Sequence, residues 1–98
     1  MNKELERIIT ILQSLEEQIR KEYKAKIMGV FGSYVRGEQK ESSDVDILAN
    51  FHEGATLFDL VGLADFLEEK LDVNVDIVSE RAVREELKEQ ILKEVVMV

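Results

Sequence analysis

Apolar residues switch between helical and strand-like spacing several times along the chain, and this alternation limits the folds that it can adopt. Helical spacing marks three stretches, at residues 3–23, 56–70 and 81–93. Short apolar runs typical of buried strands lie at 26–31, 44–51 and 72–79, and residues 95–98 are expected to add a short edge strand. The pattern predicts an α/β (α+β) fold, with a small mixed β-sheet of three to four strands packed against helices.

Each expected helix follows a residue that can cap it. Asn2 is placed to cap the first helix, Thr56 the second and Ser79 the third. The residues expected on the core-facing side of the second helix are Leu57, Leu60, Val61, Ala64, Leu67 and Leu71. The residues Phe58, Leu63 and Phe66 lie off that face, and form either a partner-binding patch or a second side of the core. On the third helix the residues expected to face inward are Val83, Leu87 and Ile91.

The connections predict part of the topology. The helix between the second and third strands allows a crossover connection between parallel strands. The direction of the first strand pair stays open. A length of 98 residues predicts one domain, spanning residues 1–98.

Composition excludes several classes of function. The chain carries 13 basic and 21 acidic residues, a net charge of −8, which argues against broad nucleic-acid binding because that depends on Lys and Arg. It has no cysteine and one histidine, His52, so thiolate and His-rich metal sites are excluded. No apolar run approaches the ~20 residues of a membrane span, and the first residues lack the apolar core of a signal peptide. A cytoplasmic location is therefore expected.

Asp44 and Asp46 interrupt an otherwise apolar strand. Because side chains alternate along a strand, both carboxylates are expected on one face, with Val45 and Ile47 on the other. Neighbouring carboxylates raise each other's pKa, and a divalent cation such as Mg²⁺ removes that cost. Asp76 interrupts the third strand in the same way. If the two strands are neighbours, three carboxylates converge, the minimum for a two-metal phosphoryl-transfer site with ions ~3.5–4 Å apart.

Gly32 and Ser33 follow the first strand and predict a tight turn. Glycine permits a close backbone approach or a positive φ. Ser33 is expected to cap one helical turn, whose free N–H groups attract phosphate. Arg36 follows one turn later, and its guanidinium suits phosphate oxygens.

Each of these signals also has a plain structural interpretation. An Asp-x-Asp pair is more often a turn or cap feature than a metal site, and Gly-Ser before a helical turn is usually a simple cap. Arg36 has Glu38 and Glu41 nearby in sequence as surface ion-pair partners. The plain interpretation of Asp76 is a residue at a solvated edge of the sheet. The combination is more specific, because all the plain interpretations must hold together.

The segments GSYVRG, SDVDIL and VDIV, in that order, resemble the nucleotidyltransferase superfamily of the DNA polymerase β type. That family's pattern is Gly-Ser, then Asp-x-Asp on the next strand, then a third Asp on a later strand. The resemblance covers about residues 30–78. The short chain, the Arg-Gly pair and the Ser before the Asp pair are similar to its minimal branch, the single-domain antitoxin-type nucleotidyltransferases of prokaryotes.

The resemblance implies a fold, a reaction and a set of ligands. The reaction is a Mg²⁺-dependent transfer of AMP from ATP to a hydroxyl group. By match to the motif, Asp44 and Asp46 would ligate two Mg²⁺ ions. Asp76 would hold the ion that activates the acceptor hydroxyl, and Gly32 and Ser33 would hold the β- and γ-phosphates.

The resemblance also implies a partner. Minimal members often lie beside a helical HEPN-type ribonuclease toxin, and some adenylylate a tyrosine of that toxin. A complex with such a toxin is implied, and the oligomeric state stays open. A second hypothesis is a non-catalytic antitoxin that blocks its toxin sterically, and a third is transfer to RNA ends or to a small molecule such as an aminoglycoside. The presence of all three aspartates favours the enzyme.

Overall fold

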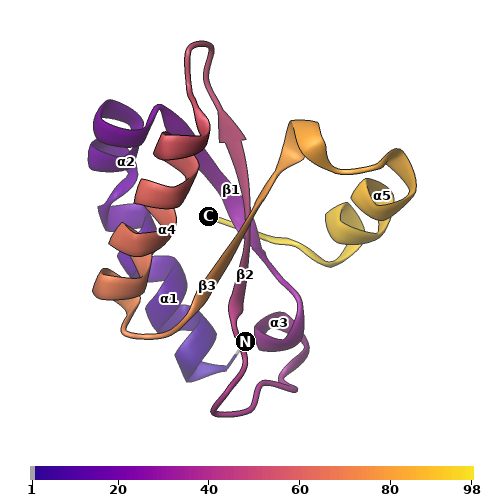
Figure 1. The fold of residues 1–98 in the computed structure, drawn as a ribbon. Coiled ribbons are helices and arrows are strands. Elements are labelled where there is room, and N and C mark those ends of the chain that lie inside the picture. The colour runs from indigo at the N-terminus through magenta and orange to yellow at the C-terminus, as the bar shows by residue number, and fades with distance from the viewer. Residues whose placement is uncertain (1) are drawn as a thin grey trace.

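A computed structural model of the chain describes residues 2–98, which form a four-stranded mixed sheet with helices on both sides (Figure 1). The elements in chain order are α1 (Lys3–Ser14), α2 (Glu16–Tyr23), β1 (Ala25–Phe31), α3 (Ser33–Arg36), β2 (Val45–Phe51), α4 (Leu57–Leu71), β3 (Val75–Ser79), the 3₁₀ turn η1 (Glu80–Ala82), α5 (Glu85–Glu94) and β4 (Val96–Met97). The predicted fold class is confirmed. Within residues 2–98 no helix combines the length and apolar character that crossing a membrane requires.

The strands follow the order β3-β2-β1-β4. Strands β2 and β3 are parallel, and α4 makes the predicted crossover between them. Strands β1 and β2 are antiparallel, which answers the question that the sequence left open. The short strand β4 pairs antiparallel with β1 and confirms the expected edge strand.

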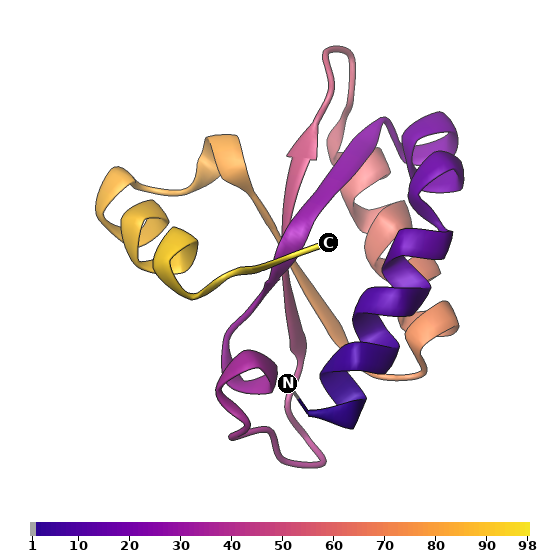
Figure 2. The same ribbon diagram turned by 180° about the vertical axis from the view of Figure 1, so that it is seen from behind.

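The two faces of the sheet are covered unequally. Helices α1, α2 and α4 lie on one face, and α3 and α5 lie on the other side, as the two views show together (Figures 1 and 2). Most of the fully buried side chains come from α1, α2, α4 and the strand positions that face them: Leu5, Ile8, Leu12, Ile19, Val30, Val45, Ile47, Leu63, Leu67 and Leu71. Leu48, which alternates with Ile47 along β2, is fully buried on the other face of the sheet. Strand side chains of the opposite parity therefore point toward α3 and α5.

The caps of the first two long helices are as predicted. The Leu5 N–H donates to Asn2 Oδ1 at 2.7 Å at the start of α1. At the start of α4, the Thr56 N–H donates to the Asp59 carboxylate at 2.8 Å. The third cap is wrong: Ser79 precedes η1, and its side chain caps no helix there.

The predicted single helix at residues 3–23 is two helices. The chain leaves helical geometry at Leu15, which has φ −99° and ψ 1°. At the preceding residue, the Ser14 hydroxyl donates to the Ile11 carbonyl at 2.6 Å. A serine that bonds back to the preceding turn competes with the backbone ladder and bends helices. Apolar spacing alone does not register such a break.

The core-facing side predicted for α4 is wrong at two positions. Leu57 and Val61 are 71% and 53% exposed, whereas Leu63, which lies off the predicted face, is fully buried. Phe58 is 89% exposed, whereas the Phe66 ring packs against Tyr23. Helix α4 is apolar on several sides, so periodicity could not choose which stripe meets the sheet. The buried stripe consists of Leu63, Leu67 and Leu71.

The third predicted strand and the third predicted helix begin later than expected. Asp72 ends α4 with a left-handed φ of 57°, and β3 starts only at Val75. The third helix starts at Glu85, because Val83 is extended (φ −84°, ψ 137°) after η1. Leu87 is 52% exposed, so its expected inward position is wrong. Helix α5 buries none of its own residues.

Candidate active site

Asp46 and Asp76 lie side by side on the thinly covered face of the sheet. They are direct partners in the parallel pairing of β2 and β3. Val45 and Ile47, which flank Asp46, are fully buried under the helices on the opposite face. Asp46 is half-buried and Asp76 is exposed. Strand alternation thus brings two of the three predicted carboxylates together.

Asp44 lies one residue before the strand in which the sequence predicts it. Strand β2 begins at Val45, so Asp44 precedes it and is exposed. A side chain outside the strand need not follow the strand's alternation. Asp44 is nevertheless close enough for its charge to act on Asp46.

The electrostatic environment of Asp46 favours a bound cation. Partial burial raises the pKa of Asp46 above its ordinary value, and the negative charges of Asp76, Asp44 and Glu94 raise it further. The Arg36 guanidinium acts in the opposite direction. Ionised carboxylates in such a cluster repel one another, and a nearby positive charge removes that cost.

The donor set suits a hard divalent cation, but it is not fully assembled. Asp44, Asp46 and Asp76 offer carboxylate oxygens, which are the ligands that Mg²⁺ prefers. Among residues 2–98, however, no three His, Cys, Asp or Glu side chains are arranged to hold a metal ion. The chemistry of the three aspartates fits the ion.

Gly32 joins β1 to α3 in a conformation that requires glycine. Its φ is 82°, and a Cβ added at this position would collide with the Asp46 carboxylate. Gly32 is also the N-cap of α3, so Ser33 is the first residue of that turn and not its predicted cap. The backbone therefore passes directly against the half-buried aspartate.

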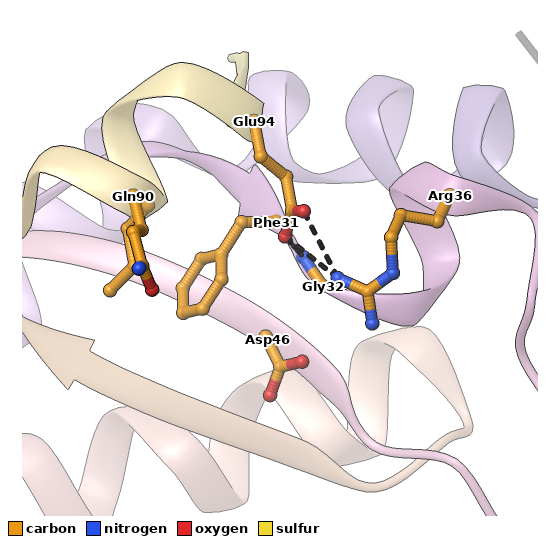
Figure 3. Close-up of a pocket in the computed structure, with 7 residues that line it drawn as sticks. Phe31, Gly32, Arg36, Asp46, Gln90 and Glu94 are labelled. Carbon is orange, nitrogen blue, oxygen red and sulfur yellow. Dashed lines mark hydrogen bonds and ion pairs between the residues drawn. The ribbon is translucent and has the colours of Figure 1, made fainter. Parts of the chain in front are cut away.

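Arg36 lies at the end of α3 and makes two ion pairs. Its Nε lies 2.7 Å from Glu38 Oε1, which is one of the two surface partners expected from the sequence. Its Nη1 lies 3.0 Å from Glu94 Oε2 and 3.1 Å from Glu94 Oε1. The same Glu94 Oε1 accepts the Gly32 N–H at 2.6 Å (Figure 3).

These residues surround a pocket of about 310 Å³ between the sheet and α5 (Figure 3). Its lining residues are Phe31, Gly32, Arg36, Asp46, Gln90, Ile91 and Glu94. Three residues predicted from the sequence meet here, while Asp44, Asp76 and Ser33 do not line the pocket. The sequence interpretation missed the contribution of α5. The available signal was Glu94 itself, because a carboxylate in the last turn of a helix opposes the helix dipole.

Residues 5–98 match the family model for a nucleotidyltransferase domain. The chain belongs to the nucleotidyltransferase domain family. This nucleotidyltransferase is 42% identical over 94 residues to protein adenylyltransferase MntA of Thermococcus cleftensis, a match that covers 96% of this chain and 95% of that protein. The resemblance inferred from the three sequence segments is confirmed.

Two solved structures place the nucleotidyltransferase among close structural neighbours. One is a minimal nucleotidyltransferase, with 40% identity and a TM-score of 0.81, covering 96% of this chain and 95% of that one. The other is a toxin–antitoxin structure with AMP-PNP, with 27% identity and a TM-score of 0.69, covering 98% of this chain and 72% of that one. Nucleotidyltransferases generally use divalent metal ions, in agreement with the oxygen-rich donor set.

Proposed function

We propose that this nucleotidyltransferase transfers AMP from ATP to a hydroxyl of a partner protein, a tyrosine of a HEPN-type toxin, and so acts as an antitoxin. The observation that carries the proposal is the 42% identity to a protein adenylyltransferase along almost the whole of both chains. The similar toxin–antitoxin structure with AMP-PNP supports both the nucleotide and the kind of partner. We propose further that residues 1–98 act as one domain in the cytoplasm.

The proposed roles follow from the match of these residues to the family motif, and the pairing of Asp46 with Asp76 supports them. Asp44, Asp46 and Asp76 would hold two Mg²⁺ ions, which when bound would supply positive charge to the triphosphate and lower the pKa of the attacking hydroxyl. The backbone at Gly32 and Ser33 donates to the β- and γ-phosphates.

Arg36 supports the same phosphates with its guanidinium. The acceptor oxygen attacks the α-phosphorus in line and gives its proton to Asp76. The bond between the α-phosphorus and its bridging oxygen breaks, and pyrophosphate leaves. Positioning of the reactants and electrostatic stabilisation account for the acceleration of AMP transfer, because the reaction needs no covalent intermediate with the protein.

The proposal is tested with ATP labelled at the α-phosphate, Mg²⁺ and a purified HEPN toxin. Wild type is compared with the double variant Asp46→Asn plus Asp76→Asn, and with Asp65→Asn, which removes an exposed carboxylate on α4. We expect the double variant to lose at least about 100-fold in transfer rate, since electrostatic groups of this kind contribute that much, and Asp65→Asn to match wild type. ATP labelled at the γ-phosphate should leave the toxin unlabelled.

Two outcomes oppose the proposal. Label transfer that survives in the double variant would contradict the assigned metal site. Toxin neutralisation without transfer, in wild type and double variant alike, would support the second hypothesis of a binding protein that blocks the toxin sterically.

A further inference from the structure

Glu94 binds the two groups that are best suited to hold a phosphate in the pocket. Its Oε1 accepts the Gly32 N–H at 2.6 Å, and both of its carboxylate oxygens contact Arg36 Nη1, at 3.0 and 3.1 Å. Figure 3 shows the carboxylate reaching down from α5 to these donors, above Asp46. A carboxylate and a phosphate are bound by the same charge-assisted hydrogen bonds. The side chain therefore takes the place that a phosphate oxygen would need.

The helix that carries Glu94 has polar contacts at both ends and no fully buried side chain. Helix α5 buries none of its residues. Near its first turn, Lys88 Nζ lies 3.2 Å from Glu80 Oε1, and at its last residue Glu94 makes the contacts to Gly32 and Arg36. After Glu94 the extended Val95 leads into β4, which is fixed to the sheet. If the Glu94 carboxylate releases Gly32 and Arg36, α5 can move away from the pocket without disturbing the core.

The charges around Glu94 also favour its departure when a nucleotide is present. Glu94 is one of the negative groups that act on Asp46, together with Asp44 and Asp76. A triphosphate in the pocket adds further negative charge, and like charges a few ångströms apart repel strongly in a partly desolvated site. The carboxylate and the triphosphate therefore compete for the single Gly32 N–H and for the charge of Arg36.

We propose that Glu94 competes with the triphosphate for the Gly32 N–H and Arg36, so that nucleotide binding requires Glu94 to leave and α5 to move off the pocket. Glu94 is thus a residue that sets nucleotide affinity, although it does not take part in the chemistry. This inference rests on the proposed function, because it assumes that Gly32 and Arg36 hold the triphosphate.

Calorimetric titration with AMP-PNP and Mg²⁺ tests the competition. In Glu94→Gln the contact to Arg36 loses its charge, so a larger fraction of molecules has free phosphate donors. We expect the Kd to fall about tenfold, because apparent affinity scales with the fraction that is competent to bind. The matched control is Glu89→Gln, which removes the same charge from an exposed position on the same helix and should leave the Kd unchanged. The affinity for inorganic tripolyphosphate with Mg²⁺ should rise by the same factor in Glu94→Gln.

The outcomes separate this inference from the proposed function. Suppose that wild type binds AMP-PNP and transfers AMP, and that Glu94→Gln binds AMP-PNP with the same affinity as wild type or with a lower one. The proposed competition is then wrong, and the proposed function stands. If neither wild type nor Glu94→Gln binds AMP-PNP, both are wrong. An equal gain in Glu89→Gln would also overturn the inference, since the effect would then come from net charge alone.

A measurement on the wild-type protein removes any dependence on how the variants fold. Hydrogen exchange of the backbone amides in residues 85–94 is followed with and without AMP-PNP and Mg²⁺. Exchange in this segment should become faster when the nucleotide displaces Glu94, because α5 loses its anchor at that end. Unchanged or slower exchange at saturating nucleotide would show that α5 stays in place, which contradicts the inference.

Discussion

At the scale of single residues, Gly32 links backbone conformation to the chemistry of the site. Gly32→Ala places a methyl group against the Asp46 carboxylate and also forces a side chain to a φ of 82°. We expect the free energy of unfolding to fall by about 1–2 kcal/mol, from strain at positive φ. We also expect AMP transfer to fall at least about 100-fold, because small displacements of reacting groups are costly. Thermal unfolding and the labelled-ATP assay measure the two effects.

Gly54 provides the matched control for that substitution. Its φ is 90°, and a Cβ at this position meets no atom within 4 Å. Gly54→Ala should therefore show a similar loss of stability and full transfer activity. Equal losses of transfer in the two variants would mean that contact with Asp46 does not matter.

The Asp46 carboxylate is expected to lower the stability of the fold, although AMP transfer needs it. It is half-buried beside other carboxylates, which raise its pKa together with burial. Asp46→Asn removes that repulsion, so metal-free protein at pH 7 should gain stability, by at most about 1 kcal/mol because solvent screens the charges. AMP transfer should be lost. Denaturant unfolding in a chelating buffer, with Asp65→Asn as reference, measures the difference, and a clear loss of stability in Asp46→Asn would contradict this account.

At the scale of elements, α4 gives a direct test of which stripe meets the sheet. Leu63 is fully buried, while Leu57, two turns earlier, is 71% exposed. Leu63→Ala should cost about 2–5 kcal/mol of unfolding free energy, the usual range for a buried leucine. Leu57→Ala should change it by less than about 0.5 kcal/mol, as for other surface sites. Similar costs in urea unfolding would mean that the N-terminal half of α4 is covered in solution.

The contact between η1 and α5 predicts a pH dependence. Hydrogen bonds from Asn50 and from Lys88 lower the pKa of Glu80 below its ordinary value of 4.5. A lowered carboxyl pKa stabilises the fold above the ordinary value, and this stabilisation is lost as the pH falls through the lowered one. Glu80→Gln should therefore be less stable than wild type at pH 7, by less than about 1 kcal/mol. The free energies of unfolding of wild type and Glu80→Gln should become equal as the pH falls from neutral to acidic. A difference that grows in acid would contradict the assignment.

The elements also show what local sequence can and cannot decide. Alternation along strands correctly separated Val45 and Ile47 from Asp46, because strand geometry has a fixed period. Caps at Asn2 and Thr56 were predicted because they depend on residues a few positions away. The break at Leu15 and the buried stripe of α4 depend on tertiary contacts, and local spacing does not contain them.

At the scale of the whole molecule, the site joins segments that are far apart in sequence. Asp46 and Asp76 could be expected together, since a crossover helix makes their strands neighbours. Glu94 could not, because it lies 62 residues beyond Gly32 and reaches it from a helix that hardly touches the core. The motif therefore predicted the sheet side of the pocket, and the structure supplied the α5 side.

The overall charge makes a last prediction about nucleotide binding. The net charge of −8 opposes the approach of AMP-PNP that carries no divalent ion. Salt screens this repulsion, because the Debye length falls from ~20 Å or more to ~8 Å as salt rises from ~20 to ~150 mM. In a chelating buffer, affinity should therefore increase several-fold over that range, and with Mg²⁺ the increase should be smaller. Affinity that decreases with salt, as it does for proteins with basic phosphate-binding surfaces, would show that Arg36 and the backbone donors outweigh the field of the whole chain.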